Sequence, residues 1–442
     1  MPDITITTAN GNNDTTTVNA DDDTSATDTN TTISANDNNS NNMPVGSWQK
    51  RIAVFLISQN LSLFGSSVVG FAVLWHITLE TSSGIWMMLT TICITIPQLL
   101  ISLFAGVWAD RHNRKNIIMI ADSLIALATF VLAISFLLGF RRMELLLIVS
   151  VVRALGAGIQ SPAVNAIYPQ LVPEERLVKV QGINQTIGSA ITLLSPAVGG
   201  ILLGTIGIVG AFFVDVVTAA LAVLVMSRIH VERPPAADSI KSMWQDISGG
   251  ILHIWHRKQL RRLIICLLFS FILITPAFTL IPLMIERAFG NEVWRLTVHE
   301  LVWSTAMILS GIFVSAKGKF ENKTRTIATC IVGLGITFGL LGLSWNFMSF
   351  LVFLGLAGLF WPVLSAVQTV FVQKTVPAEL QGRVFSVIQI IMMGAIPIAI
   401  LFFGPLADVV KIELILLVSS VLLALVGVVY GVSEIHMLGE CG

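Results

Sequence analysis

Twelve apolar runs, each long enough to cross a lipid bilayer, follow one another from residue 52 onward. A helix needs about 20 consecutive apolar residues to span the hydrocarbon core. The runs lie at 52–77, 85–108, 117–138, 144–166, 183–205, 207–228, 263–286, 298–316, 326–345, 348–372, 384–407 and 412–433. Tryptophans stand near run ends, where an interfacial aromatic belt is expected: Trp48, Trp75, Trp86, Trp108, Trp294 and Trp345. The pattern predicts an all-α polytopic membrane protein.

The runs divide into two sets of six at a long polar stretch, residues 229–262. A short repeat supports this division, because residues 172–177 (VPEERL) follow the fourth run and residues 376–381 (VPAELQ) follow the tenth. Duplicated six-helix halves are typical of secondary transporters. We therefore predict two pseudo-symmetric six-helix bundles and a short C-terminal tail. The predicted boundaries are 48–228 for the first bundle, 229–262 for a cytoplasmic central loop, 263–434 for the second bundle and 435–442 for the tail.

Composition narrows the possible function classes. Hydrophobic residues make up 54% of the chain and charged residues 12%, whereas an average soluble domain has about 25% charged residues. Secreted enzymes, disulfide scaffolds and nucleic-acid binders are therefore excluded. The four cysteines are scattered and predict neither a disulfide framework nor a metal site: Cys93, Cys266, Cys330 and Cys441. The chain lacks a G-x-x-x-x-G-K-[ST] loop, so we expect no ATP hydrolysis, no cofactor and no enzymatic activity.

The N-terminal segment, residues 1–47, is polar and acidic. It contains 11 Thr, 10 Asn, 7 Asp and 4 Ser, with no Lys, Arg or Glu. Such a segment buries too little apolar surface to offset its ordering entropy, so we expect a disordered cytoplasmic tail. Its composition fits a solvated extension, and an interaction or phosphorylation tail is the alternative. Because the whole chain has zero formal charge, residues 48–442 carry +7.

The basic residues predict the orientation in the membrane. With the N-terminus in the cytoplasm, 20 Lys and Arg fall on inner segments and 5 on outer segments, and Arg153 lies within a run. Positive charge accumulates on cytoplasmic loops. We therefore expect both termini to lie on the cytoplasmic side of the plasma (cytoplasmic) membrane.

Residues 106–115 (GVWADRHNRK), between the second and third runs, contain an Asp between a small residue and three basic residues. The segment closely resembles motif A of the major facilitator superfamily, G-x-x-x-D-R-x-G-R-K, and the matching residues are Gly106, Asp110, Arg111, Arg114 and Lys115. Asn113 stands where Gly is usual, and Asn also tolerates a left-handed backbone. The resemblance implies the major facilitator fold. It also places Asp110 against the start of the eleventh helix, near Gly382 and Arg383, where it would latch the outward-facing state.

Two further segments resemble motifs of the same superfamily. Residues 195–200 (SPAVGG) are similar to the antiporter motif C, with Ser in place of the first Gly; its residues are Ser195, Pro196, Gly199 and Gly200. Residues 153–158 (RALGAG) are similar to motif B, whose intramembrane Arg is Arg153. Ionisable residues within spans are usually functional, so Arg153, Asp215 and Asp122 are candidates for proton coupling. The depths of the helices favour Asp215 as the partner of Arg153, with Asp122 second, and a purely structural ion pair is the alternative.

The resemblance extends over residues 50–433 to the macrolide-efflux (Mef-type) branch of the superfamily, with matching stretches at 109–112, 161–166, 171–175, 367–369 and 382–386. It implies a secondary exporter that expels amphipathic drugs in exchange for protons by alternating access. Export of a siderophore or another native metabolite is one alternative, and a non-transporting membrane sensor is another.

The resemblance also implies that the first, fourth, seventh and tenth helices line a central cavity. Polar candidates for substrate contact are Gln59, Asn60, Ser62, Ser66 and Gln368. Phe360 and Trp361 offer aromatic surface to a large apolar ligand. Buried Gln and Ser also tie helices together, so a structural role is the alternative for these side chains.

Overall fold

The computed structural model describes residues 47–229, 231, 252–318 and 320–440. The predicted tail therefore lies outside the described residues except for Ser47, and so does most of the predicted central loop. The last two residues, 441 and 442, also lie outside them.

The described chain contains twelve spans that are long and apolar enough to cross a membrane, which confirms the predicted number. The first bundle consists of α1 (Ser47–Thr81), α2 (Gly84–Arg111), α3 (Arg114–Leu137), α4 (Met143–Leu171), α5 (Glu174–Thr205) and α6 (Ile208–Ser227). The second consists of α8 (Lys258–Thr279), α9 (Ile281–Phe289), α10 (Val293–Lys317), α11 (Lys323–Gly342), α12 (Phe347–Thr375), α13 (Ala378–Val409) and α14 (Ile412–Glu440). Helices α8 and α9 together form the seventh span.

Among the helix starts, the largest differences from the predicted apolar runs are those of α5 and α13, which begin nine and six residues earlier than their runs at 183–205 and 384–407. Helix α5 begins at Glu174 and α13 at Ala378, directly after Pro173 and Pro377, which have φ of −56° and −55°. Both prolines are N-cap residues with ψ of 144°, and a proline there has no backbone N–H that would need a partner. The first turns are polar, so hydropathy alone misses them. The seventh span also departs from a single helix, because it breaks at Leu280, before the proline at the start of α9.

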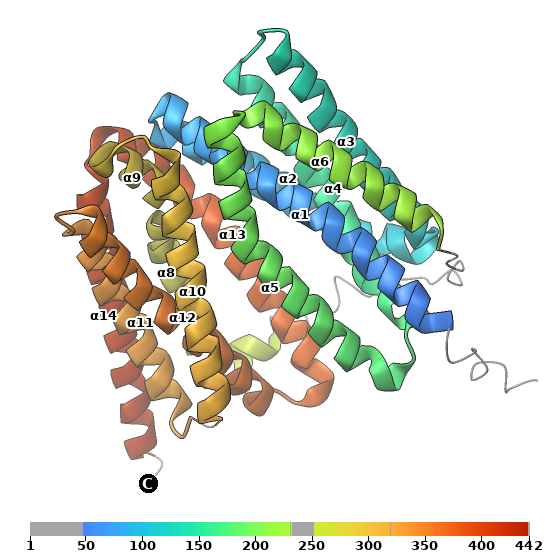
Figure 1. The fold of residues 1–442 in the computed structure, drawn as a ribbon. Coiled ribbons are helices and arrows are strands. Elements are labelled where there is room, and N and C mark those ends of the chain that lie inside the picture. Colours follow the sequence, from blue (N-terminus) through green and yellow to red (C-terminus); the bar gives the residue numbers. More distant parts are fainter. Residues whose placement is uncertain (1–46, 230, 232–251, 319, 441–442) are drawn as a thin grey trace, which may run out of the picture. The chain divides into compact units, whose positions relative to one another are not determined.

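Helix packing repeats between the two bundles (Figure 1). In the first bundle α1 packs on α5 and α6, α2 on α4, and α3 on α4 and α6. In the second, α8 packs on α13 and α14, α10 on α12, and α11 on α12 and α14. Each pair in one bundle thus has its counterpart in the other, as a duplicated six-helix unit requires. This confirms the two pseudo-symmetric bundles.

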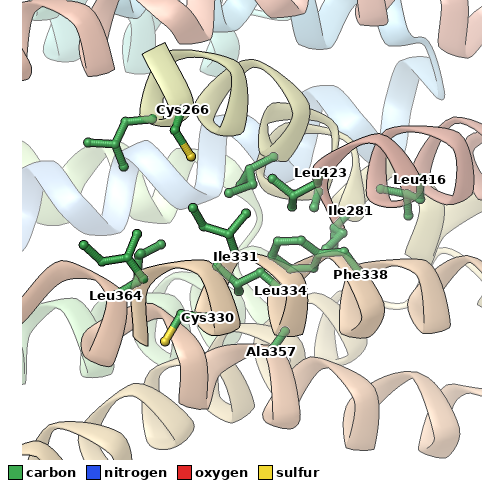
Figure 2. Packing of buried hydrophobic residues seen from close by; sticks show 14 of the residues in the cluster. Cys266, Ile281, Cys330, Ile331, Leu334, Phe338, Ala357, Leu364, Leu416 and Leu423 are labelled. Atoms are coloured by element: carbon green, nitrogen blue, oxygen red, sulfur yellow. The ribbon is translucent and has the colours of Figure 1, made fainter. Parts of the chain in front are cut away.

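The buried core of the second bundle is aliphatic and aromatic (Figure 2). Side chains of α8, α11 and α14 meet there, among them Cys266, Ile331, Phe338 and Leu423. Helix α11 approaches α14 closely at Gly335, where a Cβ atom would lie 2.7 Å from the backbone nitrogen of Ala424. Membrane helices associate without a hydrophobic driving force, and small residues at their contacts let the backbones approach closely. Cys93, Cys266 and Cys330 are free thiols.

Candidate transport site

The bundles meet mainly along two pairs of helices, α2 with α13 and α5 with α10, and α1 also touches α9. We call the end of the helices at which α1 begins the Ser47 end, and the end at which α1 finishes the Thr81 end. At the Thr81 end, a Cβ on Gly84 would overlap the carbonyl oxygen of Gly404, and a Cβ on Gly200 would overlap the hydroxyl of Thr297. The bundles are therefore in tight contact at this end.

The same four helices are uncrowded at glycines nearer the Ser47 end. A Cβ added at any of these glycines would have no atom of a described residue within 4 Å outside its own helix: Gly106 of α2, Gly182 and Gly188 of α5, Gly311 of α10 and Gly382 of α13. Gly106 and Gly382 belong to the predicted gating set. Because neither has a close neighbour on another helix among the described residues, the structure does not bring these two glycines into contact.

Arg153 and Asp215 form an ion pair inside the first bundle. Asp215 on α6 is fully buried, and the Arg153 side chain is 14% exposed. The same carboxylate accepts from the hydroxyls of Thr129, at 3.0 Å, and Ser66, at 3.2 Å. Arg153 also donates to the Thr129 hydroxyl at 2.6 Å. This group of four residues, the Arg153 network, links α1, α3, α4 and α6.

Asp122 on α3 is equally buried but has no cationic partner among its contacts. Its Oδ1 accepts from the Ser62 hydroxyl at 2.6 Å and from the Gln160 amide at 2.9 Å. No described residue donates to Oδ2, which is also buried. A buried carboxylate oxygen without a donor is costly when charged. Asp122 and Asp215 therefore occupy different environments, although each is an Asp within a predicted apolar run.

A cavity of about 450 Å³ lies against these two groups. Four of the predicted substrate residues line it, namely Gln59, Asn60, Ser62 and Ser66. The wall also includes Arg153 and four amide side chains that the sequence analysis did not single out: Gln98, Gln160, Asn165 and Asn184. The amides of Asn60 and Asn184 are 3.3 Å apart and join α1 to α5. The cavity wall is thus a hydrogen-bonding surface with apolar patches.

The two predicted aromatic residues, Phe360 and Trp361, lie in different environments. Trp361 and Gln368 line a second cavity of about 230 Å³ within the second bundle. Phe360 does not line either cavity, because its ring packs where a Cβ of Gly333 on α11 would be, at 2.6 Å. The helix rotation that turns Trp361 toward the cavity turns its neighbour away. Phe360 therefore faces neither cavity, and its contact with substrate stays a prediction.

The basic residues of motif A attach α3 to neighbouring helices. Arg114 donates to the carbonyl of Ala166 on α4 at 2.7 Å. Lys115 donates to the carbonyls of Ser227 and Ile229, at 2.7 and 2.6 Å, where the C-terminus of α6 attracts a cation. The side chains of Asp110 and Arg111 lie outside the described residues. The exposed Arg383 lies in the first turns of α13.

Asn113, which stands where motif A usually has Gly, does not adopt the left-handed backbone that Asn would tolerate. Its φ of −65° and ψ of 111° are extended rather than left-handed. Its side chain accepts from the backbone nitrogen of Lys115 at 3.0 Å and thereby caps α3. Asn therefore suits this position because it is a good N-cap residue.

The predicted antiporter motif lies at close helix contacts. A Cβ on Gly199 would lie 3.2 Å from the carbonyl oxygen of Val68 on α1, and Gly200 faces Thr297 on α10. Ser195 and Pro196 are buried, and no described residue bonds to the Ser195 hydroxyl. The motif thus lets α5 approach one helix of its own bundle and one of the other.

Three ionisable residues escaped the sequence reasoning. His299 and Glu300 lie inside the predicted run 298–316, and the general rule for ionisable residues in a span could have flagged them. Asp408 stands one residue beyond the predicted run 384–407 and could have been noticed as an acid at a helix end. It accepts hydrogen bonds from the backbone nitrogens of Gly84 and Ile85 in the first bundle.

Comparisons with known proteins agree with this architecture. The family model of the Major Facilitator Superfamily matches residues 55–400. Macrolide efflux protein A of Streptococcus pyogenes is 27% identical over 389 residues, which cover 87% of this chain and 96% of that protein. Multidrug efflux pump Tap of Mycolicibacterium fortuitum is 22% identical, with 83% and 90% covered.

Solved structures share the fold at low identity. A bacterial homologue of the human lysosomal transporter Spinster, in an inward-facing and unoccupied conformation, superposes with a TM-score of 0.67 at 14% identity, covering 90% of this chain and 99% of that one. A bacterial homologue of the iron transporter ferroportin, in an inward-facing state, gives 0.66 at 15% identity, covering 87% and 99%. Because the family model matches residues 55–400, the chain belongs to the Major Facilitator Superfamily and is a multi-pass membrane transporter of small substrates.

Proposed function

We propose that this chain exports amphipathic drugs, macrolides foremost, across the plasma (cytoplasmic) membrane in exchange for protons. The observation that carries the proposal is the 450 Å³ cavity, whose wall reaches the buried carboxyl group of Asp122 through Ser62 and Gln160. Its volume lies within the range of about 300–1,000 Å³ for small-molecule sites. The relatives named for macrolide and multidrug efflux support the direction and class of transport.

Both termini lie in the cytoplasm in this proposal, as the distribution of Lys and Arg predicts. The Thr81 end then faces outside, and its close contacts at Gly84 and Gly200 belong to an inward-facing state. In the outward-facing state the Ser47 end would close instead. Asp110 would then accept hydrogen bonds at the N-terminus of α13, whose partial positive charge favours an acid.

We assign proton binding to Asp122 ahead of Asp215. Asp215 already has a cation and two hydroxyl donors, so losing its charge would leave Arg153 uncompensated. No described residue bonds to Oδ2 of Asp122, and a proton there would leave both hydrogen bonds to Oδ1 in place. Both donors, Ser62 and Gln160, line the cavity, so substrate or water in the cavity can disturb these hydrogen bonds. A change in its hydrogen bonds changes the proton affinity of a carboxyl group, which is what coupling requires.

The test is transport by Asp122→Asn in inside-out vesicles loaded with a pH-sensitive dye. Asparagine keeps the size and one acceptor oxygen, so the protein should reach normal abundance. We expect macrolide binding to remain, while drug-induced proton release and proton-driven uptake are lost. Glu321→Gln, which alters an exposed acid between α10 and α11, is the matched control and should transport normally. Normal proton-driven uptake by Asp122→Asn would exclude this assignment.

Export of a siderophore or another native metabolite is the second candidate. The 450 Å³ cavity is lined by amides and by Arg153, with no carboxylate among its lining residues. Such a wall suits neutral or anionic oxygen-rich ligands as well as drugs. A binding competition on the purified protein separates the two candidate functions. Bound macrolide is challenged with an anionic siderophore, and bound siderophore is challenged with a macrolide. Binding of the siderophore alone would favour the second candidate.

A further inference from the structure

A hydrogen-bonded cluster at the Thr81 end connects the start of α2 in one bundle to the end of α13 in the other. Asp408 on α13 accepts from the backbone nitrogens of Gly84 and Ile85, at 2.6 and 3.0 Å, and from the Ser83 hydroxyl at 2.8 Å. The first turn of a helix leaves such nitrogens unpaired and carries partial positive charge. The carboxylate of one bundle therefore caps a helix of the other.

Arg287 on α9 completes this cluster. It donates to the carbonyl oxygens of Ser82 and Ala407, each at 2.6 Å, and to Asp408 at 3.0 Å. The Ser82 hydroxyl donates to Glu286, also on α9, at 2.6 Å. Ser82 has φ +45°, in the left-handed region that non-glycine residues seldom adopt. The contacts on both its hydroxyl and its carbonyl hold the α1–α2 turn in this unusual conformation.

The sequence around Asp408 has the spacing of motif A. Gly404 and Asp408 stand four residues apart near the end of α13, as Gly106 and Asp110 do near the end of α2. Residues four apart share a helix face. At the Thr81 end the glycine packs on Gly84 and the acid caps the same helix. The same helix pair, α2 and α13, thus carries a glycine and an acid at each of its two ends.

We propose that Gly404, Asp408 and Arg287 form a latch that positions α2 against α13 at the Thr81 end and must break for that end to open. It is the counterpart of motif A on the opposite helix and at the opposite end. In one state Asp408 caps α2; in the other state Asp110 caps α13. Asp408 is a positioning residue in this cycle, and its partial exposure of 23% suits a contact that breaks and reforms. The assignment of this end to the outside rests on the proposed orientation.

Thiol accessibility tests the latch without substrate or a proton gradient. Native cysteines are first replaced by alanine, and a single cysteine is then placed at Val73, which lines the cavity and is 6% exposed. A membrane-impermeant maleimide is applied to cells and, separately, to inside-out vesicles. Asp408→Asn should raise the labelling rate from outside roughly tenfold, because hydrogen bonds to a charged group shift an equilibrium by about that factor. A cysteine at Ser161, nearer the Ser47 end, should become less reactive in the vesicles.

Three further variants distinguish a latch from a general loss of structure. Ser83→Ala removes one hydrogen bond and should raise the labelling rate from outside less than Asp408→Asn does. Asp408→Glu keeps the charge, so its labelling rate should stay close to that of the parent. Glu292→Gln is the control, because its carboxylate pairs with Arg295 inside the second bundle, at 3.1 Å. An unchanged rate from both sides in well-expressed Asp408→Asn would overturn the latch. A rise only from the vesicle side would support the latch and overturn the proposed orientation.

Discussion

Replacing Asp215 by Asn tests whether the Arg153 network holds the first bundle together. Asn keeps the volume of the side chain but removes the charge that faces Arg153. Breaking one partner of a buried ion pair costs about 3–5 kcal/mol. The Arg153 side chain is 14% exposed to the cavity, so water can solvate part of the freed charge. We therefore expect a loss of about 2–4 kcal/mol in the free energy of unfolding.

Hydrogen bonding supports the same estimate. The Asn oxygen can still accept from Arg153 and Thr129 if its nitrogen faces the Ser66 hydroxyl, which can turn to accept. The geometry therefore survives, and the missing charge is the main loss. Since 2 kcal/mol is a factor of about 30 in the ratio of folded to unfolded protein, abundance in the membrane should fall visibly.

The assay is thermal stability of the detergent-solubilised protein, followed by size-exclusion chromatography, together with abundance in membranes. The double variant Arg153→Met with Asp215→Leu removes both charges and should recover most of the stability, because well-packed apolar replacements of a buried pair are often neutral. Full abundance and unchanged thermal stability of Asp215→Asn alone would refute the structural argument. If that protein also binds drug but lacks proton-driven efflux, Asp215 regains its place as the coupling residue.

Three other predictions concern the tail, motif A and the aromatic pair. Deletion of residues 2–42 should leave drug efflux at the parent rate, and loss of efflux at normal abundance would contradict this. Asp110→Asn should raise the ratio of inward-facing to outward-facing molecules about tenfold, because it removes a helix-terminus contact worth about 1–2 kcal/mol, and export should fall. Unchanged export and unchanged thiol accessibility at the Ser47 end would argue against this prediction. Phe360→Ala should lower the free energy of unfolding by about 2–3 kcal/mol, less than the roughly 3–5 kcal/mol of a fully buried Phe because the ring is only half-buried, and should change drug affinity little. Trp361→Ala should weaken drug binding, measured by competition with a radiolabelled drug; the reverse pattern would show that Phe360 contacts substrate.

Some contacts of the candidate site follow from sequence, and others do not. The pairing of Arg153 with Asp215 is predictable, because the distance of each residue from its helix end places both at a similar depth. The distinct state of Asp122 is not, because depth says nothing about which side chains surround a carboxylate. The different orientations of Phe360 and Trp361 depend on the rotation of α12, and hydropathy does not determine this rotation because the helix is largely apolar around its circumference.

The sequence by itself determined the twelve spans, the duplicated halves and the family of this protein. It could do so because a bilayer forces every backbone polar group to be satisfied within its own helix, so that the apolar runs alone mark the spans. Only the tertiary structure decided that Asp408 caps α2 and that Gly84 and Gly200 meet the opposite bundle. These contacts join residues far apart in the chain, and they depend on the tilt and rotation of whole helices, which no local pattern encodes.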